Sequence, residues 1–241
     1  MLADENDCVE VSGLIKNYKN FTALNNITFN IKCGEKYSLL GPNGAGKSTT
    51  LKILAGLLKP DSGFVKIGGQ DPTTVEAKKY IGYLPEDAYP YPNLSVISNL
   101  EYIGAIRGVQ NLADRIDELF NGLDLRDYVN NKVMTLSRGN RQKVSVALAI
   151  IHNPKIVLLD EPLNYLDIPT QKKVITMLEK LNATILVSTH IMEIAERLSQ
   201  NIIIINHGKI TWTGTMDQLK SMITGDESIE DVVEKLMIDV F

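Results

Sequence analysis

The sequence has little cysteine, and this excludes a cysteine-based metal site. Its only two cysteines, Cys8 and Cys33, stand too far apart to form the closely spaced pairs that bind zinc or iron–sulfur clusters. We therefore expect free thiols in a reducing cytosol, with a single disulfide as the weaker alternative.

Long apolar segments are also missing. The longest purely apolar runs, residues 146–151 and 202–205, fall far short of the roughly 20 residues that a membrane-spanning helix needs. Residues 1–5 are acidic and contain no apolar core, so we expect no secretory signal. Any action at a membrane is then expected to pass through a partner.

Basic residues are in the minority. The 25 lysines and arginines face 29 aspartates and glutamates, which gives a formal net charge of −4. This balance argues against a protein held on nucleic acid by phosphate contacts. We find no repeats and no low-complexity segments. With 241 residues, of which 44% are hydrophobic, the chain is long enough to bury the core of one α/β domain.

The glycine-rich stretch at residues 41–49 is the strongest functional signal that is present. It follows an apolar run and precedes leucines at helical spacing, so it joins a predicted strand to a predicted helix. Its glycines let backbone N–H groups approach a phosphate, and the helix start adds the positive end of a dipole. The stretch consists of Gly41, Pro42, Asn43, Gly44, Ala45, Gly46, Lys47, Ser48 and Thr49.

Two side chains of this stretch carry its expected chemistry. Lys47 supplies a full positive charge for the β- and γ-phosphates, and the Ser48 hydroxyl is placed to bind Mg²⁺. The alternative is a glycine-rich turn with a surface lysine, but the flanking strand and helix argue against it. The sequence therefore predicts a nucleoside-triphosphate site.

Two acids follow the most apolar strand of the sequence. Residues 156–159 are apolar on both faces, as expected for a central parallel strand covered by helices. Asp160 and Glu161 come at its carboxyl end, where such sheets bind ligands. Asp160 is predicted to hold Mg²⁺ through water, and Glu161 to orient or deprotonate the water that attacks the γ-phosphate. A solvated surface turn is the less favoured alternative.

Four further positions have both a functional and an ordinary structural interpretation. Tyr18 is either a half-buried surface aromatic or a face on which adenine stacks. Glu86 is either solvated or in contact with Mg²⁺ or the attacking water. His190 is either a structural histidine or a sensor of the γ-phosphate. Ser137 is the expected N-cap of a long helix whose start is also equipped to hold an anion.

Alternation and helical spacing predict the other elements, with the first forty residues forming an antiparallel β region. The predicted strands are residues 8–11, 23–30, 36–40, 64–67, 79–84, 184–188 and a hairpin of 201–206 with 209–213. The predicted helices are residues 94–106, 112–123, 141–152 and 228–241, the last packed on the body or on a partner.

In this order the motifs resemble those of the nucleotide-binding subunit of an ATP-binding cassette (ABC) transporter. The resemblance runs from about Cys8 to Met222. Gly41 to Ser48 match Walker A, Ile156 to Glu161 match Walker B, Tyr18 matches the adenine-stacking aromatic and His190 the switch histidine. The family signature is matched by Leu136, Ser137, Arg138, Gly139 and Asn140, and the loop after Walker B by Asn164, Tyr165, Leu166 and Asp167.

The resemblance implies the fold class and its subdivision. It implies an α/β, P-loop NTPase fold with a RecA-like core, an antiparallel β subdomain and a helical signature subdomain. The single cassette, residues 1–241, is expected to divide into a core (1–92 and 153–225), a helical subdomain (93–152) and a C-terminal helical tail (226–241).

The resemblance also implies a mechanism. Two chains, expected to be identical copies, would form a head-to-tail dimer with ATP and Mg²⁺ between one phosphate loop and the other chain's signature. Lys47, Glu161 and His190 would act in catalysis, and Ser48, Glu86 and Asp160 would hold Mg²⁺. A separate membrane subunit would couple hydrolysis to transport, expected to be export, at the cytoplasmic face. No nucleic-acid partner is expected.

Several positions depart from the family pattern. Arg138 replaces the first signature glycine, Asn140 the usual glutamine, and Glu86 the glutamine after the preceding strand. Leu163 and Tyr165 stand where a small polar residue and a glycine are typical, and Tyr165 is bulky for a loop that crosses the dimer interface. Glu86, the basic signature residue and the acidic segment 228–233 together resemble the exporter branch.

Two other functions are weighed against transport. A cassette protein acting in translation or DNA repair usually carries two cassettes or long insertions, and this sequence has one cassette and no basic surface stretch. A regulatory subunit with little hydrolysis is the second alternative. Glu161 argues against it, because degenerate sites in the family commonly lose this acid.

Overall fold

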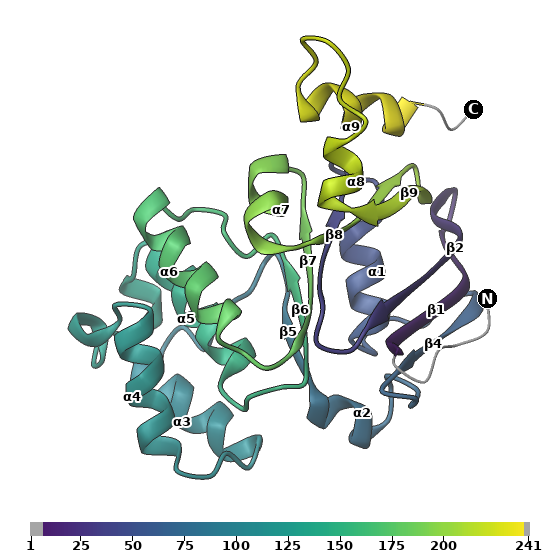
Figure 1. Ribbon diagram of the computed structural model, residues 1–241. Coiled ribbons are helices and arrows are strands. Elements are labelled where there is room, and N and C mark those ends of the chain that lie inside the picture. The colour runs from purple at the N-terminus through teal and green to yellow at the C-terminus, as the bar shows by residue number, and fades with distance from the viewer. Residues whose placement is uncertain (1–6, 239–241) are drawn as a thin grey trace.

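The computed structural model describes residues 7–238, which form two β-sheets with helices around them (Figure 1). A three-stranded antiparallel sheet has the order β2-β1-β4, and a six-stranded sheet has the order β5-β6-β7-β3-β8-β9. In the larger sheet β9 runs antiparallel to β8, whereas the other neighbours are parallel. The mixed α/β architecture predicted from the sequence is therefore confirmed.

The bounds of the elements are as follows. The strands are β1 (Asp7–Tyr18), β2 (Phe21–Lys32), β3 (Lys36–Leu40), β4 (Ser62–Ile67), β5 (Ile81–Leu84), β6 (Ile156–Asp160), β7 (Thr184–Thr189), β8 (Asn201–Asn206) and β9 (Lys209–Thr215). The helices are α1 (Lys47–Leu54), α2 (Val75–Tyr80), α3 (Val96–Ile106), α4 (Leu112–Gly122), α5 (Arg138–Ile150), α6 (Ile168–Glu179), α7 (Met192–Leu198), α8 (Met216–Lys220) and α9 (Ile229–Ile238).

The parallel sheet is buried on both faces because alternate side chains of each strand point in opposite directions. In β6, Ile156 and Leu158 join a core with α1 and the antiparallel sheet, whereas Val157 and Leu159 join a core with α3 to α7. Helix α1 thus lies between the two sheets, and α5, α6 and α7 cover the opposite face (Figure 1). Because β3, β6 and β7 are parallel neighbours, the loops at their carboxyl ends emerge at one edge.

Two predicted helix starts are confirmed by their caps. The Ser95 hydroxyl accepts a hydrogen bond from the Ser98 N–H at 3.1 Å, and the Ser137 hydroxyl accepts one from the Asn140 N–H at 3.2 Å. Each bond satisfies one of the donors that a helix start leaves free.

Two element predictions were wrong. Residues 36–40 do not belong to the antiparallel region but form β3, in the middle of the parallel sheet. Residues 79–80 end helix α2, and only 81–84 form the strand β5. Helix α2 is capped at Thr74, whose hydroxyl accepts a hydrogen bond from the Ala77 N–H at 3.2 Å.

The expectation of free thiols was also wrong, because Cys8 and Cys33 form a disulfide. Antiparallel pairing of β1 with β2 places Asp7 opposite Lys32 and Val9 opposite Ile31. Cys8 and Cys33 are thereby brought side by side, with their Cα atoms 4.8 Å apart. The separation of the two cysteines along the sequence did not predict their distance in space, because β1 and β2 pair as an antiparallel hairpin whose ends lie side by side.

The C-terminal helix α9 packs on the chain itself. Val232 and Val233 are buried in a cluster with Ile202 and Ile204 of β8. The Asn206 side-chain amide donates to the Met237 carbonyl at 2.7 Å, near the end of α9. The rest of the predicted tail helix, residues 239–241, and the acidic N-terminal residues 1–5 lie outside the described residues. Across 7–238, no helix is both long and apolar enough to cross a membrane.

Candidate nucleotide-binding site

The glycine-rich stretch joins β3 to α1, as predicted, and its backbone depends on glycine at two positions. Gly46 has a φ of 109°, and a Cβ added there would lie 2.7 Å from the Ala23 carbonyl oxygen. A Cβ added to Gly41 would lie 2.2 Å from the Ile205 carbonyl oxygen. The first position requires a left-handed backbone, and the second requires close approach to β8, so a side chain at either would displace the loop.

Lys47 is the first residue of α1 and is held against the loop. Its ammonium donates to the Gly41 carbonyl at 2.7 Å and to the Pro42 carbonyl at 3.1 Å. Its Nζ atom also lies 3.9 Å from Oε1 of Glu161. Burial lowers the pKa of Lys47, and the carboxylates of Glu161 and Asp160 oppose that shift. The loop is therefore closed around a buried cation.

The two acids at the end of β6 lie opposite Lys47. Oδ1 of Asp160 accepts a hydrogen bond from the Ser188 hydroxyl at the end of β7. Oε1 of Glu161 lies 2.7 Å from Nδ1 of His190. The other carboxylate oxygens, Oδ2 of Asp160 and Oε2 of Glu161, are buried without a hydrogen-bond partner among the described residues. Such oxygens are expected to have a ligand, because a buried polar atom without one is costly.

These groups line a pocket of about 300 Å³ at the carboxyl edge of the sheet. The aromatic ring of Tyr18, predicted as a possible stacking face, stands at its wall and is 44% exposed. Phe21, which the sequence analysis did not select, stands beside it. The pocket is lined by Tyr18, Phe21, Ala23, Asn43, Gly44, Gly46, Lys47, Ser48, Thr49, Glu86, Asp160 and Glu161.

The chemistry of these oxygens fits a hard cation that keeps some of its water. Ser48, Glu86 and Asp160, the three predicted Mg²⁺ ligands, all line the pocket. Across residues 7–238, however, no three His, Cys, Asp or Glu side chains gather closely enough to hold a metal ion. Mg²⁺ commonly binds one or two carboxylates and completes its shell with water and substrate phosphates, so the donors present suit it only together with a nucleotide.

The pKa of Glu86 is raised in this pocket. Burial raises the pKa of its carboxyl, the nearby Asp160 and Asp87 raise it further, and Lys47 acts in the opposite direction. The cause is that a negative charge is less stable away from water and beside other negative charges.

The signature residues are not part of this pocket. Ser137 caps α5, and neither it nor Arg138, Gly139 or Asn140 lines the pocket that contains Lys47. Arg138 and Gly139 lie instead beside the loop 161–167, which we call the acid loop. A Cβ added to Gly139 would be 2.9 Å from the Tyr165 carbonyl oxygen. In the same loop the Asp167 carboxylate caps α6, accepting from the Thr170 N–H at 3.0 Å.

The acid loop has an unusual backbone. Glu161 has a φ of 48° and Tyr165 a φ of 66°, in the left-handed region that residues with a Cβ rarely adopt. Such residues cost on the order of 1–3 kcal/mol each and persist where the surroundings hold them, commonly at active sites. Gln142, another residue that the sequence analysis did not select, donates from α5 to the Pro162 carbonyl at 2.9 Å.

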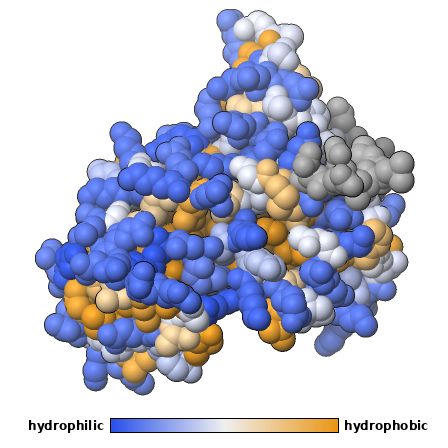
Figure 2. All heavy atoms as spheres, turned by 60° about the horizontal axis from the view of Figure 1, so that its bottom comes forward, coloured by the Kyte–Doolittle hydropathy of each residue, from blue (hydrophilic) through white to orange (hydrophobic). Residues whose placement is uncertain are grey.

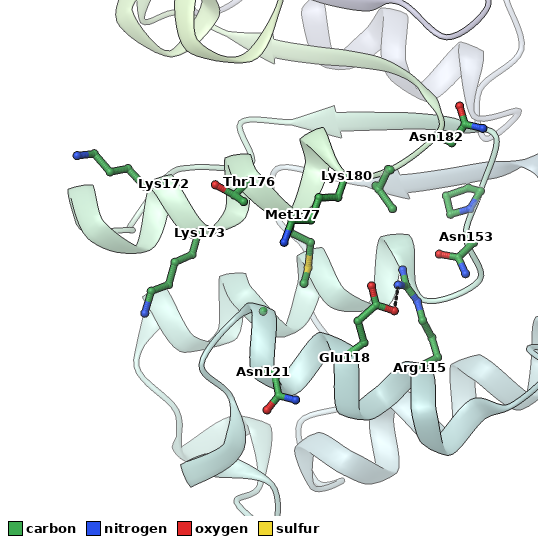
Figure 3. Close-up of a pocket in the computed structure, with 13 residues that line it drawn as sticks. Arg115, Glu118, Asn121, Asn153, Lys172, Lys173, Thr176, Met177, Lys180 and Asn182 are labelled. Carbon is green, nitrogen blue, oxygen red and sulfur yellow. Dashed lines mark hydrogen bonds and ion pairs between the residues drawn. The ribbon is translucent and has the colours of Figure 1, made fainter.

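A larger cavity, of about 910 Å³, opens between α4 and α6, away from the phosphate loop (Figure 3). Of its lysines, Lys172 and Lys173 come from α6 and Lys180 directly follows it, and Lys173 is paired with Asp124. Its one described carboxylate, Glu118, lies 2.7 Å from the Arg115 guanidinium, which also donates to the carbonyls of Ile150 and Ile151. Asp160 and Glu161 line the pocket beside the phosphate loop and not this cavity, so the cavity is separate from the site described above.

The strand–glycine loop–helix junction, the buried lysine and the paired acids at the end of a parallel strand define a P-loop nucleotide-binding protein. Comparison with known proteins narrows this class. The ABC transporter family profile matches residues 24–164, so the chain belongs to that family. It is an ABC transporter ATP-binding subunit.

Individual relatives agree with this assignment. An uncharacterised ABC transporter ATP-binding protein, MJ1023 of Methanocaldococcus jannaschii, is 36% identical over 88% of this chain and 79% of its own length. The ABC transporter ATP-binding protein NatA of Bacillus subtilis is 36% identical over 82% of this chain and 83% of its own length.

Solved structures show the same fold. The structure of an ATP-binding subunit of an ABC transporter superposes with a TM-score of 0.87 at 27% identity, covering 95% of this chain and 99% of that one. A dimeric cassette, MJ0796, in a post-hydrolysis state with ADP and Pi, superposes with a TM-score of 0.80 at 30% identity, covering 86% and 98%.

Proposed function

We propose that this chain hydrolyses ATP in a head-to-tail dimer and thereby drives export through a separate membrane subunit. The observation that carries the proposal is the separation of two phosphate-binding features in one chain. The pocket of Lys47 lacks the capped helix start at Ser137, although both are suited to hold the same anion. A second chain, turned to face the first, supplies the missing half of each site.

The chain's own residues then divide the work. Lys47 and the N–H groups at the start of α1 bind the β- and γ-phosphates, and Tyr18 stacks on the adenine. Ser48, Asp160 and Glu86 would hold Mg²⁺, which would neutralise phosphate charge. Glu161 takes a proton from the attacking water, and its contact with His190 Nδ1 at 2.7 Å fixes the orientation of the carboxylate. Ser137 and Gly139 bind the γ-phosphate held by the partner.

Dimerisation is supported by the solved relatives, since the cassette MJ0796 was captured as a dimer with ADP and Pi. In our proposal ATP favours the closed pair because it adds contacts that exist only in that state. Loss of the γ-phosphate removes those contacts and reopens the pair. We propose that the two chains are identical copies.

A membrane subunit is expected to dock on a groove beside α3. Two adjoining hollows share Tyr83, Ile103 and Arg107, and their walls carry exposed apolar side chains such as Tyr89 and Ile106. Figure 2 shows hydrophobic side chains gathered among polar ones on this lower face of the molecule. Exposed apolar surface of this kind marks protein contacts. We therefore place the chain on the cytoplasmic face of a membrane, held there by its partner.

Export is supported in our proposal by the departures at Glu86 and Arg138 and by the names of two relatives. A third relative, the molybdate/tungstate import ATP-binding protein WtpC of Thermococcus kodakarensis, is 32% identical over 94% of this chain. The probable multidrug ABC transporter ATP-binding protein YbhF of Escherichia coli is 32% identical over 96% of this chain, which spans 41% of that protein. The linearmycin resistance protein LnrL of Bacillus subtilis is 32% identical over 92% of this chain.

The experiment that tests the function uses Glu161→Gln, which keeps the shape of the side chain but cannot accept the proton. We expect hydrolysis to fall by about 100-fold or more, the range of a lost general base. Size-exclusion chromatography with ATP and Mg²⁺ should then show an ATP-bound dimer. The control, Glu161→Gln with Ser137→Ala, should remain a monomer. Normal hydrolysis by Glu161→Gln would show that another residue activates the water.

A further inference from the structure

Two residues that depart from the family pattern, Arg138 in the signature and Tyr165 in the acid loop, are in contact. Arg138 is the first residue of α5, and Tyr165 belongs to the acid loop. The guanidinium carbon of Arg138 lies 5.5 Å from the centroid of the Tyr165 ring. This distance is within the range of a cation–π contact. The Tyr165 side chain is 63% exposed, so the pair stands at the surface and not in the core.

The backbones of the same two segments are also in contact. Gly139 follows Arg138, and a Cβ placed on it would lie 2.9 Å from the Tyr165 carbonyl oxygen. That separation is shorter than side chains tolerate, so the first turn of α5 rests directly on the acid loop. A shift of this turn cannot leave the loop unaffected, because packed backbones have no free space between them.

Gln142 makes the third connection, one turn further along α5. Its side-chain amide donates to the Pro162 carbonyl at 2.9 Å and to the Glu161 carbonyl at 3.4 Å. It is only 6% exposed. Residues four apart lie on one side of a helix. Arg138 and Gln142 therefore contact the acid loop from the same side of α5, Arg138 at Tyr165 and Gln142 at Pro162.

The acid loop depends on such outside contacts. Its backbone is left-handed at both Glu161 and Tyr165, a conformation that surrounding contacts must maintain. On the other side, the Gln171 side chain of α6 donates to the Leu166 carbonyl at 3.2 Å. Helix α6 thus holds the far end of the acid loop. At the near end Gln142 of α5 contacts the Glu161 carbonyl, and the Glu161 N–H donates to the Ser188 carbonyl of β7 at 3.2 Å.

We propose that Gln142 and the Arg138–Tyr165 pair are positioning residues for Glu161, through which α5 reports the partner's nucleotide to this chain's own catalytic acid. The inference rests on the proposed function, in which the start of α5 binds the ATP of the partner. When that ATP seats against Ser137, α5 fixes the acid loop and hence Glu161. Each chain then hydrolyses its own ATP when the opposite site is filled.

The first test compares two glutamines that hold the same loop from different helices. Gln142→Glu and Gln171→Glu each replace an amide donor by a carboxylate facing a carbonyl. We expect Gln142→Glu to lower kcat about tenfold, as a small misplacement of a catalytic group does, with the KM for ATP changed less than about twofold. Gln171→Glu, whose helix does not contact the partner's nucleotide, should lower kcat clearly less. Equal losses, or a parallel change in KM, would overturn the role of Gln142.

The second test uses the exposed pair, where substitution does not threaten the fold. Arg138→Ala and Tyr165→Ala should each lower kcat about threefold, and the double variant about threefold as well, because the contact acts as one unit. Tyr165→Phe keeps the ring and should restore turnover relative to Tyr165→Ala. A double variant that loses the product of the two single effects would contradict the pairing, as would a loss confined to Arg138→Ala.

Two measurements distinguish failure of the positioning role from failure of the proposed ATPase function. Thermal unfolding shows whether Gln142→Glu is folded; if it is not, the exposed pair alone decides. Lys47→Ala is assayed beside every variant. If Lys47→Ala hydrolyses ATP at the wild-type rate, the proposed function is wrong. If Lys47→Ala is inactive while the α5 variants match the wild type, only the positioning role is lost.

Discussion

At the scale of single residues, Glu86 carries the charge that is hardest to reconcile with phosphate binding. Its pKa is raised, chiefly by burial and then by Asp160, and in its ionised form the carboxylate adds a negative charge beside the proposed phosphate site. We expect Glu86→Gln to lower the KM for ATP roughly threefold at about pH 8, the size of one screened charge a short distance away. As the pH falls toward the raised pKa, wild-type Glu86 takes up a proton and the difference should shrink.

Steady-state hydrolysis measured across pH with both proteins checks this. Glu101→Gln is the matched control, because it removes an exposed acid of α3 that neither lines the pocket nor acts on the pKa of Glu86. A Glu86→Gln effect that stays constant as the pH falls would contradict charge repulsion. A raised KM would show that the contribution of Glu86 to holding Mg²⁺ outweighs its repulsion of the phosphates.

The sequence predicted which motif residues would meet, but not every residue that supports them. Lys47, Asp160 and Glu161 follow parallel strands, and the ends of parallel strands share an edge, so their meeting was predictable. Ser188, Phe21 and Gln142 support the site through pairing of strands and crossing of helices distant in sequence. No spacing in the sequence reports such contacts, apart from the aromatic side chain of Phe21 close to Tyr18.

At the scale of elements, the junction between α5 and β5 contains a half-buried histidine. Nε2 of His152 lies 3.1 Å from the Ile81 carbonyl oxygen, and Nδ1 is buried without a hydrogen-bond partner among the described residues. Burial, with the nearby Arg107 next, lowers the pKa of His152 to about 4. The unfolded chain takes up this proton below its ordinary pKa of about 6.5, whereas the folded chain does so only near the lowered value.

Folding stability should therefore fall as the pH drops from about 6.5 toward the lowered pKa. From His152 alone we expect a loss of about 2 kcal/mol between pH 7.5 and pH 5. His152→Gln keeps an amide that can donate to Ile81 and does not titrate, so it should lose about 2 kcal/mol less than the wild type over that interval. Urea unfolding at the two pH values measures the difference. His207→Asn, at an exposed turn, is the control, and a His152→Gln slope equal to its slope would contradict the prediction.

Which elements form was more predictable than where each one belongs. The hairpin of β8 with β9 and the capped starts of α3 and α5 follow from local turn and cap chemistry. The assignment of β3 to the parallel sheet depends on its partners β7 and β8, more than 140 positions away. The Cys8–Cys33 bond likewise depends on pairing of β1 with β2. Alternation shows that a strand exists but not which strand lies beside it.

At the scale of the whole molecule, the chain presents half of two sites. Lys47 and Glu161 complete one half at the edge of the parallel sheet, and Ser137 begins the other at α5. A pair related by a two-fold axis brings the two unlike halves together twice, because each surface meets its complement in the other copy. It follows that two variants, each damaged in a different half of the site, should form active mixed dimers although each is inactive alone.

Lys47→Ala destroys the phosphate loop of a chain but leaves its signature helix intact, and Ser137→Ala does the reverse. Each variant alone should be nearly inactive, since both sites of its dimer contain one damaged half. In an equal mixture, random pairing makes half of the dimers mixed, and each of these contains one site built from two intact halves. We expect hydrolysis to recover to at most about a quarter of the wild-type rate. The rate is measured against total chain concentration, with each variant assayed alone as its own background. Substantial hydrolysis by Ser137→Ala assayed alone would mean that ATP is hydrolysed without the partner's Ser137. A mixture no more active than its inactive components would mean that one intact site does not work beside an empty one, as the coupling through α5 requires.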